Sequence, residues 1–136
     1  MTTQTRLVST VIARPWTDVY AYASDPRHLA DWAAGLARAQ VEPAPDRPGT
    51  WIADSPMGRV EVTVAPENDL GVLDYVVRLP DGTEVPNPLR VVPLDDGAEV
   101  VFHVRRREGM SEDDFAADAE AVARDLETLR RILETD

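Results

Sequence analysis

The chain has 136 residues, a length that suits one domain with a buried core, so we predict a single domain over residues 1–136. Its formal net charge is −11, from 25 acidic and 14 basic side chains. Such a charge would repel phosphate backbones and anionic lipids, so we predict no nucleic-acid partner. The absence of cysteine excludes disulfides and thiolate zinc sites, and two histidines are too few for a multi-histidine metal site.

The N-terminal part predicts one strand followed by two short helices. Thr5 to Ala13 alternates loosely and is rich in β-branched residues, which is typical of a strand. Pro15 suits the first turn of a helix, and Asp25 and Pro26 supply the N-cap and first position of a second helix, which Gly35 would end. We read no signal peptide and no membrane span, and we expect a cytoplasmic protein.

The middle of the chain is predicted to be all strand. Short connections rich in Pro, Gly and Asp separate the apolar runs, which favours an antiparallel meander. The predicted strands cover residues 38–42, 50–54, 59–65, 72–79, 83–94 and 98–106.

Alternation along these strands assigns one face to the core. Asn87 is the polar member of an otherwise apolar set, and Pro86 and Pro88 flank it. Neither proline can donate to a ladder, so we expect a bulge there. The inward sets are Val60, Val62 and Val64; Leu73, Tyr75, Val77 and Leu79; Val85, Asn87, Leu89 and Val91; and Val100, Phe102 and Val104.

The last stretch, Ser111 to Asp136, is predicted to be one long helix with Ser111 as its N-cap. Its apolar residues follow steps of four and three, which would suit a dimeric coiled coil or a helix lying on its own sheet. Fewer than four heptads are present, so we favour the second alternative. The first half is rich in alanine, which leaves room between helix and sheet or simply favours the helix. The stripe comprises Phe115, Ala119, Val122, Leu126, Leu129 and Leu133.

The order of these elements and several short motifs together resemble the START-like (SRPBCC) superfamily, and in particular its polyketide cyclase/dehydratase-like branch. The resemblance covers nearly the whole chain, and it rests on the order and spacing of the motifs rather than on any one of them. The motifs are Ala13-Arg14-Pro15, Asp25-Pro26-Arg27-His28-Leu29 with Trp32, Gly71-Val72-Leu73-Asp74, Asn87-Pro88-Leu89-Arg90-Val91, Glu99-Val100-Val101-Phe102 and Gly109-Met110-Ser111.

The resemblance implies an α+β helix-grip fold. In this fold a curved seven-stranded antiparallel sheet surrounds a long C-terminal helix, two short helices follow the first strand, and a cavity lies between sheet and helix. Members of the superfamily typically bind apolar or aromatic small molecules in that cavity, and some cyclise or dehydrate polyketides.

Candidate cavity-lining residues follow from these faces and from the resemblance. Asn87 is the strongest polar candidate, since an inward amide needs a partner, although neighbouring backbone could supply it. Tyr75 carries a hydroxyl that a ligand, Asn87 or water could satisfy, whereas Phe102 fits core packing as well. Trp32 could line the cavity mouth or anchor its helix, and Trp51 could point either way. The full set is Trp32, Trp51, Val62, Tyr75, Asn87, Phe102, Phe115 and Ala119.

Three functions remain open at this point. The first is binding of an apolar or aromatic, lipid- or polyketide-like molecule by a monomer or homodimer. The second is a cofactor-free cyclase or dehydratase in which Tyr75, Asn87 or Trp32 orients the substrate or moves protons. The third is a protein-interaction module. No nucleotide-binding motif appears, so we expect no cofactor. Arg106 has inward parity and could reach an acidic ligand, although a solvated strand end is the simpler alternative.

Overall fold

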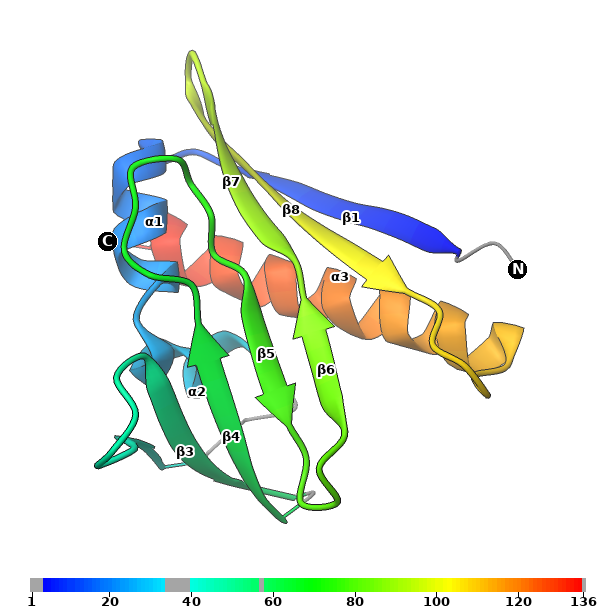
Figure 1. Ribbon diagram of the computed structural model, residues 1–136. Coiled ribbons are helices and arrows are strands. Elements are labelled where there is room, and N and C mark those ends of the chain that lie inside the picture. The colour runs from blue at the N-terminus through cyan, green and yellow to red at the C-terminus, as the bar shows by residue number, and fades with distance from the viewer. Residues whose placement is uncertain (1–3, 34–39, 57, 136) are drawn as a thin grey trace.

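The computed structural model describes residues 4–33, 40–56 and 58–135, and its elements follow the predicted order (Figure 1). The elements are β1 (Thr5–Ile12), α1 (Trp16–Ala23), the 3₁₀ helix η1 (Pro26–His28), α2 (Leu29–Trp32), β2 (Val41–Pro43), β3 (Thr50–Ser55), β4 (Gly58–Val64), β5 (Tyr75–Arg78), β6 (Glu84–Asn87), β7 (Leu89–Leu94), β8 (Gly97–Arg105) and α3 (Glu112–Glu134). All strand pairs are antiparallel, in the orders β1-β8-β7 and β2-β3-β4-β5-β6, and α3 lies behind them.

This arrangement confirms the predicted α+β helix-grip fold but corrects the strand count. The described residues form eight strands rather than seven, because the predicted strand 83–94 breaks at Pro88 into β6 and β7. Pro86 and Pro88 lack the backbone N–H that a continuous ladder would need, so the expected irregularity is a complete break. β6 therefore pairs with β5, and β7 pairs with β8.

Short backbone bonds join the two sheets just beyond the break. Leu73 N–H donates to the carbonyl of Leu89 at 2.9 Å, and Val91 N–H donates to that of Gly71 at 2.9 Å. The predicted strand 72–79 is thus divided between two partners. Residues 71–73 contact the start of β7, whereas only Tyr75–Arg78 forms the ladder with β6.

Asp74 holds the start of β7 next to the break. One carboxylate oxygen accepts the Leu89 N–H at 2.8 Å, and the Arg90 guanidinium donates to both oxygens at 3.0 and 2.8 Å. The hydrogen-bonded Arg90 is the main reason that the pKa of Asp74 lies below its ordinary value of 3.8. Because a lowered pKa stabilises the fold only while the carboxyl is ionised, this contribution is complete at neutral pH and is lost on acidification.

Asp74→Asn should therefore lower the free energy of unfolding by about 1 kcal/mol at pH 7. The difference from the wild type should shrink as the pH falls below the ordinary value of 3.8 and through the lowered pKa. Urea unfolding at pH 7 and pH 3 measures both quantities. Asp69→Asn, at an exposed position, is the control that should change little at either pH. An unchanged stability difference at the two pH values would contradict the assigned role.

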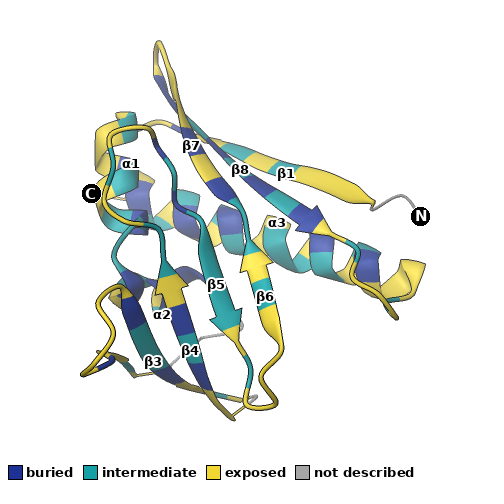
Figure 2. Cartoon of the chain, viewed as in Figure 1, coloured by how far each residue is buried: buried dark blue, intermediate teal, exposed yellow. Residues whose placement is uncertain are grey.

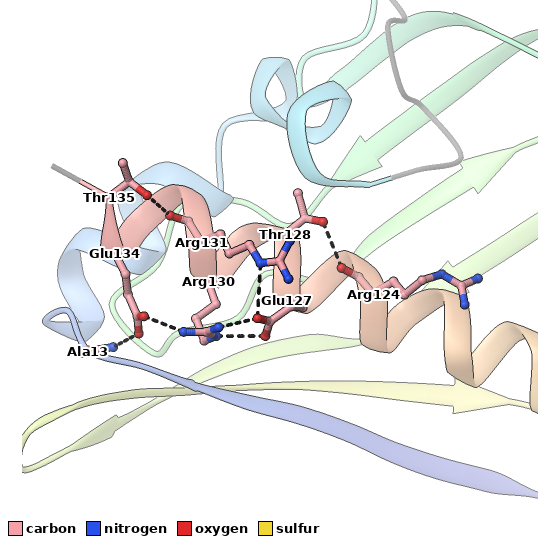
Figure 3. Close-up of polar contacts among 8 residues, drawn as sticks. All are labelled: Ala13, Arg124, Glu127, Thr128, Arg130, Arg131, Glu134 and Thr135. Carbon is pink, nitrogen blue, oxygen red and sulfur yellow. Dashed lines mark hydrogen bonds and ion pairs between the residues drawn. The ribbon is translucent and has the colours of Figure 1, made fainter.

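The long helix begins and ends with defined polar contacts. Ser111 accepts the Asp114 N–H at 3.0 Å, which confirms it as the N-cap. At the other end Arg130 forms ion pairs with Glu127 and Glu134, and Glu134 accepts the Ala13 N–H at 2.8 Å, which ties the helix to the end of β1 (Figure 3). Along α3, buried positions recur between exposed ones (Figure 2), and they are Phe115, Ala119, Leu126, Leu129 and Leu133.

The first short helix begins one residue later than predicted, since Pro15 precedes α1 as its N-cap. The second begins as predicted, with the Asp25 carboxylate accepting the Arg27 N–H at 3.0 Å, but it is divided into η1 and α2. The expected helix end at Gly35, and residues 38 and 39 of the predicted strand 38–42, lie outside the described residues. Within the described parts of the chain, no helix is both long and apolar enough to cross a membrane.

Candidate functional site: a pocket between the sheet and the long helix

A pocket of about 330 Å³ lies between the sheet and the middle of α3. Its volume falls at the lower end of the range of about 300–1,000 Å³ that is usual for small-molecule sites. Apolar side chains from β5, β6, β8, α2 and α3 form most of its wall, and a few polar groups interrupt them. The lining residues are Trp32, Ala33, Tyr75, Val77, Leu79, Val85, Pro86, Asn87, Phe102, His103, Val104, Arg105, Arg107, Asp118, Ala121, Val122 and Asp125.

The structure places four of the eight predicted site residues in this wall. Trp32 comes from α2, Tyr75 from β5, Asn87 from β6 and Phe102 from β8. These segments are far apart in the sequence, and the antiparallel sheet and the α2–α3 contact bring them together. All four have the inward parity of their segments or lie on α2, but the lining also includes Pro86, His103 and Arg105, which have the opposite parity on β6 and β8.

The other four predicted residues lie outside the set that lines the pocket. Val62 is fully buried in the core, where packing leaves it no surface for a ligand. Trp51 pairs with Val62 in register and so shares its face, but it lies on β3, away from the pocket-lining strands. Phe115 and Ala119 belong to the buried stripe of α3, and the Arg6 guanidinium of β1 lies 5.3 Å from the Phe115 ring centroid.

Sequence reasoning missed the helix residues that do line the pocket. Asp118, Ala121 and Asp125 occupy the face of α3 next to the buried stripe. Val122, which was predicted as part of the stripe, also lines the pocket, and all four residues are half-buried. A cavity wall is by nature less enclosed than a packed core, so a search for the most apolar stripe selects the wrong face. The alanine-rich first half of the helix was the usable signal, since it includes Ala121.

Tyr75 is both an aromatic and a polar member of the pocket wall. It lines the wall and retains some accessible surface, and no described residue forms a hydrogen bond with it. Burial, with a smaller contribution from the Asp125 carboxylate, raises the pKa of Tyr75 above its ordinary value. The phenol therefore stays protonated at neutral pH, where it can donate a hydrogen bond but cannot act as a base.

Asn87 lies beside Tyr75, since the two residues are register partners in the β5–β6 ladder and share a face. Its Nδ2 donates to the Val85 carbonyl at 2.9 Å, so part of its amide is satisfied by its own strand. Among the described residues no donor contacts its Oδ1, which leaves an acceptor next to the tyrosine donor. Together the two side chains offer complementary polar groups on an apolar wall.

Trp32 contributes mainly its ring to the pocket wall. The residue is 3% exposed, and its Nε1 has no hydrogen-bond partner in the part of the chain that the structure describes. A buried indole N–H without an acceptor costs roughly 1–3 kcal/mol, so a small shift toward a ligand acceptor would be favourable. The described residues contain no group of three His, Asp or Glu side chains that could hold a metal ion.

A protein-family model described as polyketide cyclase/dehydrase and lipid transport matches residues 4–134 of the chain. No curated protein sequence matches it. Among solved structures, DynU16 from the dynemicin biosynthetic locus matches at 18% identity and a TM-score of 0.71, over 96% of this chain and 47% of DynU16. The chain thus spans about half the length of that protein.

Two further solved structures match over nearly their full length. CV1439 from Chromobacterium violaceum shares 18% identity with a TM-score of 0.67, over 97% of this chain and 99% of its own. Ara h 8.0201 shares 12% identity with a TM-score of 0.67, over 99% of this chain and 100% of its own. At such identities these three likenesses establish the fold alone.

Proposed function

Because the chain belongs to the polyketide cyclase/dehydrase and lipid-transport family, as its motifs predicted, we propose that it binds an apolar or aromatic small molecule between its sheet and α3. The observation that carries this proposal is the pocket itself. Its wall is largely aliphatic and aromatic, and its volume suits a compact ligand. Burial of such a ligand would release water from apolar surface, which is the main source of affinity for molecules of this kind.

Tyr75 and Asn87 add the polar contacts that would orient the ligand. A hydroxyl that remains protonated can donate to a ketone or phenol oxygen, and the neighbouring Asn87 Oδ1 can accept from a ligand hydroxyl. A small number of placed polar groups in an apolar pocket is the usual basis of specificity. A ring system that bears oxygen substituents, or a lipid-like chain with one hydroxyl or keto group, would meet these requirements.

Native mass spectrometry of the protein purified from its own host tests this proposal. We expect a species heavier than the polypeptide by one small molecule, which solvent extraction would release for identification. A stable lipid-like or aromatic compound would support binding and carriage. A bare polypeptide mass in every preparation, together with no affinity for aromatic probes, would contradict the proposal and favour a protein-interaction module instead.

One observation also supports the alternative of a cofactor-free cyclase or dehydratase. The negative charge of Asp125 contributes to the raised pKa of the Tyr75 hydroxyl, and both residues line the pocket. Such a hydroxyl could polarise a ligand carbonyl while the pocket holds a reactive chain in a folded conformation. In the same mass-spectrometric experiment, this alternative predicts a cyclised or dehydrated product in place of a stable ligand.

A further inference from the structure

Because of the break at Pro88, β6 and β8 do not pair with each other. The β7–β8 ladder reaches the Leu89–Phe102 pair, and His103 N–H makes one more bond to the Pro88 carbonyl at 3.0 Å. Beyond that bond β8 continues to Arg105, whereas β6 pairs only with β5. Figure 1 shows the two strands running apart from the point where β6 passes into β7.

The pocket reaches the surface at this gap. Its lining includes Phe102 and Val104, which are buried on the inner face of β8, and also His103 and Arg105, which have the opposite parity. A pocket that touches both faces of one strand must pass around that strand's free edge. Pro86 lies on the other side of the gap, lines the pocket and is exposed, as is Arg105. The gap between β6 and β8 is therefore the mouth.

The charges at this mouth are not balanced on its β8 side. Of the two lining arginines, Arg107 forms an ion pair within the described residues, since its Nη2 lies 4.0 Å from the Asp118 carboxylate of α3. Asp125 is engaged within the protein and acts on Tyr75. Arg105 forms no ion pair with any residue that the structure describes. Arg105 is exposed and lines the pocket, so it places a guanidinium cation at the rim.

The neighbouring Arg106, whose inward parity made it a possible but less favoured contact for an acidic ligand, is already engaged. Its Nε donates to the Met110 carbonyl at 2.9 Å, and its Nη1 donates to Gln4 Oε1 at 2.7 Å. These bonds join β8 to the start of α3 and to the N-terminal segment, so Arg106 has a structural role. Arg105 is thus the cation that a ligand at the mouth would meet.

We propose that the pocket selects amphipathic ligands with an anionic group, which Arg105 binds at the mouth between β6 and β8 while the apolar part lies inside. This inference rests on the proposed function and defines its ligand class. With a net charge of −11, most of the protein surface repels an acid, so an uncompensated arginine beside an apolar pocket is a distinctive feature. A guanidinium can bind a carboxylate through two parallel hydrogen bonds.

A matched pair of probes tests the inference. Naphthalene-2-acetic acid and naphthalene-2-acetamide have nearly the same shape and differ in charge, and titration calorimetry or fluorescence gives both affinities. We expect the wild type to prefer the acid about fivefold at low salt, as an exposed charge pair allows, with less preference at high salt. Arg105→Gln should abolish the preference, and Arg105→Lys should retain part of it.

Arg59→Gln is the control, because Arg59 is an exposed arginine outside the pocket lining and its loss should leave the preference intact. Equal affinity of the wild type for both probes, or an undiminished preference in Arg105→Gln, would overturn the role of Arg105 while the proposed binding function stands. If neither probe binds, the proposed function fails for aromatic ligands, and this inference fails with it.

Discussion

Ala121→Trp is expected to weaken ligand binding about 100-fold or more while the protein remains folded. Ala121 lies on the pocket-facing side of α3 and is half-buried, so a larger side chain there projects into the pocket. An indole would occupy much of the roughly 330 Å³ that a ligand needs. Since this space is empty of side chains, the substitution should change the free energy of unfolding by no more than about 1 kcal/mol.

Ala123→Trp is the matched control for this substitution. Ala123 lies two residues further along the same helix, is exposed and is absent from the pocket lining. Both variants introduce the same residue into α3 and carry the same cost in helix propensity. Affinity for naphthalene-2-acetic acid and the recovery of any co-purified molecule should fall only in Ala121→Trp. Unaltered binding by Ala121→Trp would mean that the ligand occupies another site.

The long helix could be predicted from the sequence because local rules determine it. Its N-cap at Ser111 and its buried residues Phe115, Leu126, Leu129 and Leu133 are confirmed. The periodicity of apolar residues identifies which side chains pack in the core, because a helix that packs on a sheet buries a continuous apolar stripe. It does not identify the adjacent face that borders a cavity, and for this reason Ala121 and Asp125 were missed.

The mouth of the pocket illustrates a second limit of sequence reasoning. Pro86 and Pro88 predicted an irregular ladder, because neither has a backbone N–H. The loss of these two donors is compatible both with a bulge and with a complete break, so the sequence alone does not distinguish them. Whether a bulge or a break forms depends on residues distant in the sequence. Gly71, Leu73 and Asp74 form hydrogen bonds with the start of β7, which therefore does not continue the line of β6. His103 and Arg105 alternate with the inward residues Phe102 and Val104, so alternation alone would place them on the outer face, yet they border the pocket beside the break.

Gly71→Ala is expected to be among the most destabilising single substitutions in the chain. Gly71 has a φ of +77°, and a Cβ there would lie 2.2 Å from the carbonyl oxygen of Val91. The same glycine accepts the Val91 N–H at 2.9 Å, so the backbone cannot move aside without losing a bond that joins the two sheets. Left-handed strain of about 1–2 kcal/mol and a lost buried bond of similar size give a loss of about 3 kcal/mol.

Gly82→Ala separates the two causes of this loss. Gly82 has a comparable φ of +89°, but a Cβ there would meet nothing within 4 Å. Its substitution should cost only the strain of about 1–2 kcal/mol. Urea unfolding followed by tryptophan fluorescence measures both variants, and the difference between them isolates the contact with Val91. Equal losses would show that residues 71–74 shift freely against β7. The start of β7 would then not be fixed by that contact, and the separation of β6 from β8 would have to arise from Pro86 and Pro88 alone.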